Sequence, residues 1–383
     1  MSDFIAVKEY NKAIASAQKI SELKTEMTES QLGFLCGIIK DRRPSKILEV
    51  GVAAGGTTLV IMQCAKELGL EISLYSADLN KNYYSDPTKE TGYIAKIAEF
   101  SEDYALVNHK YLLGSYLPEV LPDIGSGIDL LILDTVHHLP GELLDFLAAL
   151  PFLSEKAIVV LHDVALQHEK STDKYCYATQ VLLSCAKGLK YLNNSIEYPN
   201  IAAFQVDKST VDNIDDVFSA LTLTWNYKPS DSEIGIYKAW YQKHFGESSC
   251  RLFEQAVEMN ERTLSTVEEG FDDYMLTLCD SVLDRYESVY LYGAGNRGHI
   301  FHKALCDFWD NDKADECKYI VSDGKRGINN KCVVWGELDL SENALIVLTA
   351  DSKEIKETLK KSKAHWIDVP KQIWVDLERK YRE

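Results

Sequence analysis

A glycine-containing segment that follows an acidic residue is the first place where this sequence suggests ligand chemistry. An apolar stretch at 46–50 includes Glu49. Gly51 and Gly55 lie between this stretch and a second apolar stretch at 59–69. The pattern predicts a strand, a tight turn and a helix. Glycines let such a turn approach a ligand closely, and the free N–H groups of the following helix would bind a carboxylate. The alternative is a tight turn with a structural role only.

A second acidic residue favours a ligand over a purely structural turn. Asp78 ends the next predicted strand. An ionised carboxylate accepts several hydrogen bonds, so Asp78 is a candidate for binding both hydroxyls of a ribose. Gly114 and Ser115 follow the third strand, which is expected near residues 104–108, and are candidates for lining an adenine pocket.

Acids and imidazoles follow two further predicted strands. Asp134 and His137 come after the fourth strand, and His162 and Asp163 come after the fifth. Histidine titrates near neutral pH and suits a general base. The candidate catalytic residues are His137, His162 and Asp163, and His138 is a weaker candidate. The alternatives are polar strand ends and hydrogen-bonded structural histidines.

The same group of residues is a candidate cation site. Oxygen ligands suit a hard divalent cation such as Mg²⁺, and a bound cation lowers the pKa of a coordinated hydroxyl. Asp134 and Asp163 are the predicted metal ligands.

The motifs resemble those of class I S-adenosylmethionine-dependent methyltransferases. The segment from Glu49 to Thr57 resembles their motif I, which binds the amino-acid part of S-adenosylmethionine. The strand-end residues, with Asp145, resemble the bacterial macrocin O-methyltransferase and cephalosporin hydroxylase-like family, over residues 30–207. Thr135 and Leu139 depart from that pattern, which leaves the placement of the acceptor open.

The resemblance implies a cofactor, a reaction and a set of binding residues. The reaction would transfer a methyl group from a sulfonium to an oxygen of a small-molecule or glycan acceptor, with a nitrogen as the alternative. The implied cofactor-binding residues are Glu49, Gly51, Gly55, Gly56, Thr57, Asp78, Gly114, Ser115 and Asp134.

Alternating strand and helix patterns predict the element that positions these residues. The order indicates an α/β fold with a doubly wound, mostly parallel, seven-stranded sheet of the class I methyltransferase type. Two closing strands, at 190–196 and 201–206, are expected to add one antiparallel strand. Ligands of such sheets bind beyond the carboxyl ends of the strands, so the residues named above should converge there.

A second glycine-rich turn begins a smaller α/β domain. Gly293, Gly295 and Gly298 match G-x-G-x-x-G after an apolar strand, and Asp323 ends the next strand. This fingerprint predicts a site for NAD or a nucleotide-linked substrate, with Arg297 as a candidate phosphate partner. The alternatives are a degenerate Rossmann-like unit used for assembly, and a non-enzymatic scaffold. The expected domains are 1–207, a helical connector at 208–284, and a Rossmann-like domain at 285–383.

Composition limits the classes of partner. The net charge of −18 and the short basic runs argue against a nucleic-acid partner. Nine cysteines without a C-x-x-C pair indicate reduced thiols and a cytoplasmic protein. No apolar run is long enough to span a membrane, the N-terminus lacks the features of a signal peptide, and a homo-oligomer is left open.

Overall fold

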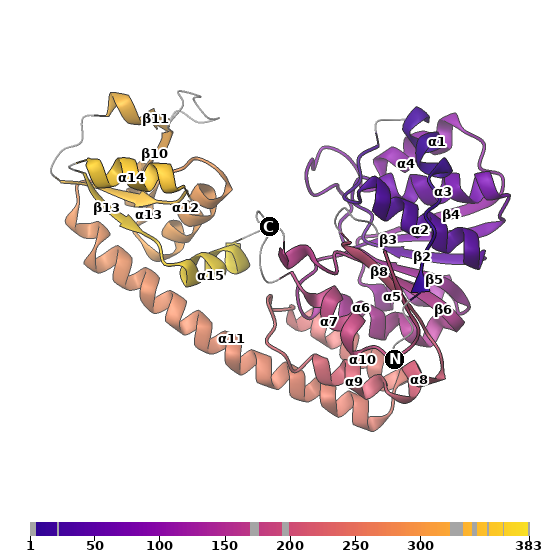
Figure 1. Cartoon of the computed structure of the whole chain (residues 1–383). Helices are drawn as coiled ribbons and strands as arrows, with labels where there is room; N and C mark the ends of the chain where they lie inside the picture. Colours follow the sequence, from indigo (N-terminus) through magenta and orange to yellow (C-terminus); the bar gives the residue numbers. More distant parts are fainter. Residues whose placement is uncertain are drawn as a thin grey trace. The chain divides into compact units, whose positions relative to one another are not determined.

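The computed structural model describes two compact units, Met1–Glu261 and Arg262–Glu383. The described residues are 5–20, 23–168, 176–193, 199–321, 332–338, 343–350, 352–362 and 364–381. Figure 1 shows an α/β arrangement in each unit. Within these residues no helix is long and apolar enough to cross a bilayer.

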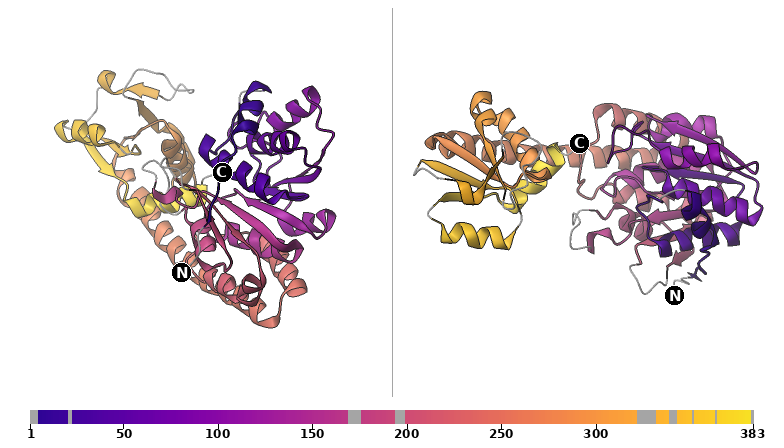
Figure 2. Two further views of the ribbon diagram at one scale, coloured as in Figure 1. Left: turned by 45° about the vertical axis from the view of Figure 1, so that its right-hand side comes forward. Right: turned by 90° about the horizontal axis from the view of Figure 1, so that it is seen from above.

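The first unit is built on a mixed sheet with helices on both faces (Figure 2). Its spatial strand order is β1-β7-β8-β6-β5-β2-β3-β4, and β8 is antiparallel to both of its neighbours. The remaining pairs are parallel, which confirms a mostly parallel sheet with one antiparallel strand. The strands are β1 (Ile5–Ala6), β2 (Lys46–Val50), β3 (Ile72–Asp78), β4 (Val107–Leu113), β5 (Ile128–Leu133), β6 (Leu153–His162), β7 (Lys190–Leu192) and β8 (Ile201–Gln205).

Two differences from the sequence analysis concern the edges of this sheet. The seven expected strands are present, and the two-residue β1 adds an eighth beside β7. The strand expected near 104–108 lies later, at β4. Both elements are at sheet edges, where partial exposure weakens the apolar pattern that a sequence offers.

Two layers of apolar side chains cover the sheet. One layer packs it against α1 (Lys12–Ile20), α2 (Glu29–Arg42), α3 (Gly56–Leu68) and α4 (Tyr93–Ser101). The other packs it against α5 (Leu117–Ile124), α6 (Gly141–Ala149), α7 (Ala178–Cys185), α9 (Ile214–Ala220), α10 (Asp231–His244) and the start of α11 (Glu247–Ser281). Strand β5 is almost wholly buried because both of its faces are covered.

The segment 208–284 is helical. Its first helices are α8 (Lys208–Asp212), α9 and α10, and these belong to the first unit. Helix α10 packs on α6: Trp240 Nε1 donates to the Ala148 carbonyl at 3.0 Å, and Tyr241 Oη donates to the Leu144 carbonyl at 3.0 Å. The 35-residue helix α11 contributes residues to both units.

The second unit has a five-stranded parallel sheet in the order β11-β10-β9-β12-β13. Its strands are β9 (Ser288–Tyr292), β10 (Lys318–Val321), β11 (Cys332–Val334), β12 (Ala344–Leu348) and β13 (His365–Asp368). Its helices are α12 (Asn296–Phe308), α13 (Asn311–Glu316), α14 (Lys353–Lys361) and α15 (Lys371–Tyr381). The parallel order agrees with the expected Rossmann-like arrangement.

Candidate functional site

The first glycine-rich turn joins β2 to α3. Its main chain packs so closely against neighbouring main chain that residues larger than glycine would clash. Gly51 has a φ of 92°, and a Cβ there would lie 1.8 Å from the Asp134 carbonyl oxygen. Gly55 has a φ of 87°, and its Cβ would lie 2.8 Å from the Cα of Gly92. A Cβ on Gly56 would lie 2.0 Å from the Lys24 carbonyl oxygen. All three glycines are therefore needed for close main-chain approach.

Asp78 holds the turn from the neighbouring strand end. Its Oδ2 accepts from the main-chain N–H of Val52 at 2.9 Å and of Ala53 at 3.2 Å. Its Oδ1 accepts from the Asn80 N–H at 2.8 Å. A carboxylate has about four acceptor positions, so Asp78 retains capacity for a further donor.

Glu49 lies beneath the turn and is fully buried. Its Oε2 accepts from the Thr58 and Ser76 hydroxyls, each at 2.7 Å. Burial raises the pKa of Glu49, only partly offset by these two bonds, to about 7. Its Oε1 makes no hydrogen bond with the described residues.

The remaining predicted cofactor residues border the turn and the end of β3. The Thr57 hydroxyl lies 3.0 Å from the Thr25 hydroxyl. Gly114 has a φ of 81°, and its N–H donates to the Asp78 carbonyl at 2.8 Å. Ser115 follows and is half-buried. Gly114 thus brings the end of β4 beside Asp78.

The structure brings Asp134, His137, His162 and Asp163 together in one cluster. One potential ligand atom from each lies within 4.8 Å of all the others. His162 Nδ1 is 2.9 Å from Asp134 Oδ1, and His137 Nε2 is 3.1 Å from Asp163 Oδ2. The cluster adjoins the turn, because the Asp134 carbonyl is the group that Gly51 approaches.

Two members of the cluster have unusual main-chain conformations. His137 has a φ of 59° and Asp163 a φ of 60°. Residues other than glycine rarely adopt this left-handed region, and such conformations gather at functional sites.

Three further polar residues complete the cluster, and the sequence analysis did not select them. Asn200 donates to Asp163 Oδ1, and Gln31 Oε1 lies 3.4 Å from His162 Nε2. Glu142, in the first turn of α6, accepts the His137 N–H at 2.6 Å. Gln31 lies in the first turn of α2, and its Oε1 accepts the Thr28 N–H in a capping box. Because this capping role is local, the sequence did not indicate that Gln31 also lies close to His162.

His138 lies outside this cluster of four. Its Nδ1 is 2.6 Å from the Val136 carbonyl oxygen, and its Nε2 is 3.7 Å from Cys176 Sγ. These contacts fit a structural role.

The charges in the cluster stabilise one another. Burial lowers the pKa of His137, but the bond and charge of Glu142, together with Asp134 and Asp163, raise it to about 9. For His162, burial also lowers the pKa and is outweighed by the charge and hydrogen bond of Asp134. Burial raises the pKa of Asp134, yet the charge of His162 produces a net decrease. Burial dominates at Asp163, whose pKa is raised.

The donor set also fits a cation. Two carboxylates and two imidazoles match the N/O ligands of divalent transition metals, and the two carboxylates alone would suit Mg²⁺. The charge of such a cation would offset both aspartates and lower the pKa of both imidazoles.

The second glycine-rich turn joins β9 to α12. Gly293 has a φ of 127°, and a Cβ on Gly298 would lie 2.0 Å from the Gly293 carbonyl oxygen. A Cβ on Gly295 would meet no described atom within 4 Å. Arg297 pairs with Glu378 at 3.1 Å and stacks over Trp374, so its guanidinium already has partners other than a phosphate. Asp323 lies outside the described residues.

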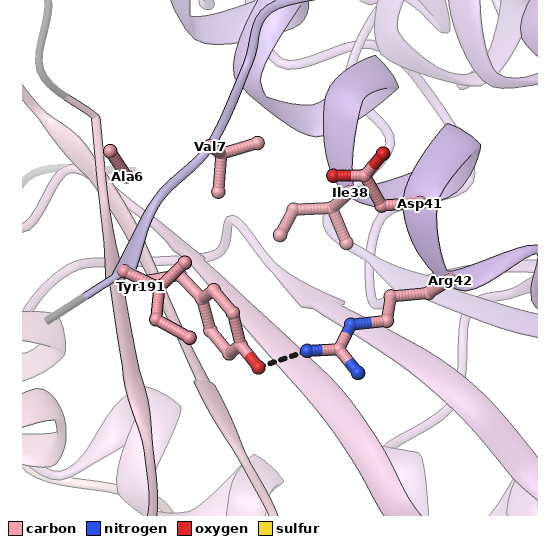
Figure 3. A pocket seen from close by; sticks show the side chains of 7 residues that line it. Ala6, Val7, Ile38, Asp41, Arg42 and Tyr191 are labelled. Atoms are coloured by element: carbon pink, nitrogen blue, oxygen red, sulfur yellow. Dashed lines mark hydrogen bonds between the residues drawn. The ribbon is translucent and has the colours of Figure 1, made fainter. Parts of the chain in front are cut away.

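A surface hollow lies elsewhere in the first unit, between the β1–β7 edge and α2 (Figure 3). Its volume is about 180 Å³, and Arg42 hydrogen-bonds to Tyr191 across it. None of the predicted site residues lines this hollow. The chemistry at the strand ends is therefore a better guide to the site than the hollow.

One comparison with known proteins gives a family match within the first unit. Residues 48–164 match the model of a family described as a methyltransferase domain. No protein of known, curated function matches the sequence.

Solved structures of O-methyltransferases show a distant likeness. An O-methyltransferase from Streptomyces achromogenes, in complex with S-adenosylmethionine, is 17% identical, with a TM-score of 0.35 over 52% of this chain and 92% of its own. One from Bacillus cereus, in complex with SAH, is 14% identical, with a TM-score of 0.33 over 50% and 87%.

The family match spans both features of the first unit. It begins within β2 and ends just after β6, so it includes the turn at Gly51 and the cluster from Asp134 to Asp163. This part of the chain is therefore similar to a methyltransferase domain.

Proposed function

We propose that this chain is an S-adenosylmethionine-dependent O-methyltransferase that acts on a small-molecule or glycan acceptor. The observation that carries the proposal is the contact between Gly51 and the Asp134 carbonyl. It joins a ligand-binding turn directly to a cluster of bases and acids. A methyl donor held by the turn would thus lie beside groups able to orient an acceptor and remove its proton.

Different residues around the turn would bind different parts of the cofactor. The N–H groups at the start of α3 would bind the carboxylate of S-adenosylmethionine, and Asp78 would bind the ribose. Gly114 and Ser115 would line the adenine site. Glu49 would support the turn from below through Thr58 and Ser76, and not by direct contact with the cofactor.

When bound, S-adenosylmethionine supplies an electrophilic methyl group on a sulfonium. The methyl group would pass to the acceptor oxygen, and the electron pair of the sulfur–methyl bond would remain with the sulfur of the leaving product. The acceptor proton passes to His137, His162 or Asp163. A histidine can take it only when its ring is neutral, and the raised pKa of both rings opposes that at neutral pH.

A divalent cation, Mg²⁺ or another, would favour the neutral rings. Asp134 and Asp163 are its proposed ligands, and His137 and His162 are available as further donors. The cation would also make a coordinated hydroxyl more acidic.

Calorimetry with S-adenosylmethionine tests the cofactor. We expect the parent to bind and Gly51→Arg to lose binding. Gly69→Arg is the matched control, since Gly69 ends α3 with open space around it. No binding by the parent, or equal binding by Gly51→Arg, would refute the proposal.

Chelation tests the cation separately. We expect a strong chelator to abolish turnover and added Mg²⁺ or Mn²⁺ to restore it. Turnover that resists chelation would remove the cation from the mechanism and leave the methyl-transfer proposal standing.

A second candidate function is binding of NAD or a nucleotide sugar by the second unit. Two observations favour it: strands β10 and β12 flank β9, which places the turn where the strand order reverses, and Gly295 has free space beside it. A thermal-shift screen should show stabilisation by one of these ligands and its loss in Gly295→Arg. Equal shifts for parent and variant would exclude this turn as the site.

A further inference from the structure

Glu142 is a fully buried acid beside the proposed active site. It occupies the second position of α6, and a carboxylate in the first turn of a helix is favoured by the helix dipole. Its position links the start of α6 to the loop that carries His137.

The contacts of Glu142 involve both the main chain and the ring of His137. Its Oε1 accepts the His137 N–H at 2.6 Å and lies 3.2 Å from Nδ1 of the same residue, which is an ion-pair distance without hydrogen-bond geometry. On the other side of the ring, Nε2 lies 3.1 Å from Asp163 Oδ2 and 3.6 Å from Asp134 Oδ1. The imidazole is therefore held between Glu142 and the cluster.

A neighbouring acid on the same helix makes a different contact. Asp145, also in α6, accepts from Tyr237 Oη at 2.6 Å, a hydroxyl from α10. Glu142 instead approaches an imidazole, and its Oε2 makes no hydrogen bond with the described residues. A buried carboxylate is costly without a partner, so the His137 contacts are what offset its burial.

We propose that Glu142 is a positioning residue, which fixes the left-handed loop at His137 and directs Nε2 of that ring toward Asp163 and Asp134. The value of this arrangement for methyl transfer rests on the proposed function. The arrangement itself does not depend on it. A carboxylate beside one ring nitrogen of a functional histidine commonly fixes which nitrogen faces the site.

The competing possibility is that Glu142 serves only the main chain of the loop. Glu142→Gln separates the two, because glutamine keeps a carbonyl oxygen for the His137 N–H and removes the charge facing Nδ1. If the role is confined to the main chain, the ring should be unaffected.

Ring ¹⁵N spectra of histidine-labelled protein test the proposal. The spectra are recorded above the His137 pKa of about 9, and the signals are assigned with His137→Gln. In the parent, Glu142 faces Nδ1 while Asp163 and Asp134 face Nε2, so we expect the proton of the neutral ring to be shared between the two nitrogens. In Glu142→Gln we expect the proton to move to Nε2, facing Asp163.

Controls separate a local from a general effect. Asp145→Asn alters a half-buried acid of the same helix and should leave the His137 signals as in the parent. His109, which lies on β4 and contacts Ser76 at 2.9 Å, reports whether each variant is folded. If Glu142→Gln does not fold, Glu142→Asp is used, and its shorter carboxylate should shift the proton in part.

The outcomes are decisive for this inference and independent of the cofactor. Unchanged His137 ring signals in the folded Glu142 variant would overturn the positioning role. Calorimetry with S-adenosylmethionine on the same samples reports on the proposed function alone, so a parent that fails to bind can still show the expected ring signals.

Discussion

The two glycine-rich turns are alike in main-chain design and differ in what surrounds them. Each joins a central strand to a helix, and each contains a glycine whose Cβ would strike a carbonyl oxygen, at 1.8 Å for Gly51 and 2.0 Å for Gly298. The first turn is held by Asp78 and adjoins four ionisable side chains. The second is held by Thr349, whose hydroxyl donates to the Tyr292 and Gly293 carbonyls, and Tyr292 stacks on Trp335.

The surroundings of the two turns differ in whether groups that could take part in a reaction lie beside the turn. A glycine-rich turn provides room and N–H donors for a ligand in either unit. Only around the first turn does the described part of the chain gather buried and half-buried acids and imidazoles that could move a proton. Our proposals therefore assign ligand binding to both turns and a reaction only to the first.

The largest expected effect comes from breaking the charge pairing at the first turn. Asp134→Asn leaves the buried His162 ring without its ionised partner, and removal of one member of a buried pair costs about 3–5 kcal/mol. Denaturant unfolding at neutral pH measures this. A loss below about 1 kcal/mol would mean that the cluster is not charged as the contacts indicate.

The pH dependence of the first unit should be the next largest effect. Asp145 is half-buried, and its removal from water raises its pKa, despite the bond from Tyr237, to about 7. The folded state therefore holds a proton that the unfolded state releases above about pH 4, so stability falls as the pH rises from about 4 to about 7.

Asp145→Asn should flatten that slope by at most about 4 kcal/mol, at about 1.4 kcal/mol for each pKa unit. Urea unfolding of parent and variant at several pH values in this window measures it. Glu49 should leave a residual slope in the variant, because its pKa is also raised. Identical slopes in the two proteins would show that Asp145 is ionised in the folded state throughout.

At the second turn, the expected effect is steric and independent of charge. Gly298→Ala places a Cβ against the Gly293 carbonyl oxygen, and we expect a loss of about 1–3 kcal/mol in the second unit. The thermal transition of that unit measures it. If Gly298→Ala is as stable as the parent, the second turn can shift to accept the Cβ. The close main-chain approach that it shares with the first turn would then not be required.

The smallest effect is expected at Gly295. The site has open space and a φ of −83°, so Gly295→Ala should change stability by less than about 0.5 kcal/mol. Reduced ligand stabilisation with unchanged intrinsic stability would identify this position as part of a binding site. A large loss of stability would instead assign Gly295 a structural role.

Much of the first unit could be predicted because its signals are local. Apolar strands with acids at their ends indicated the parallel sheet, and parallel strands bring their carboxyl ends to one edge, as found for Asp134 and Asp163. The partners of the cluster gave no such signal. Gln31 and Asn200 reach His162 and Asp163 from distant segments, and their contacts exist only once the chain is folded.

The packing of α10 on α6 could likewise not be predicted from the sequence pattern. Its aromatic residues repeat with helical spacing, which predicted a helix but not the surface that it covers. The choice of α6 depends on shape and on carbonyl groups that no local pattern records.

Helix α10 has a consequence for dividing this protein into expressible pieces. Its Tyr237, Trp240 and Tyr241 side chains are buried against α6. A recombinant fragment that stopped at residue 207 would leave that side of α6 as an open apolar surface, which favours aggregation. A fragment that reaches past His244 would keep α6 covered, and with it the helix from which Glu142 reaches His137.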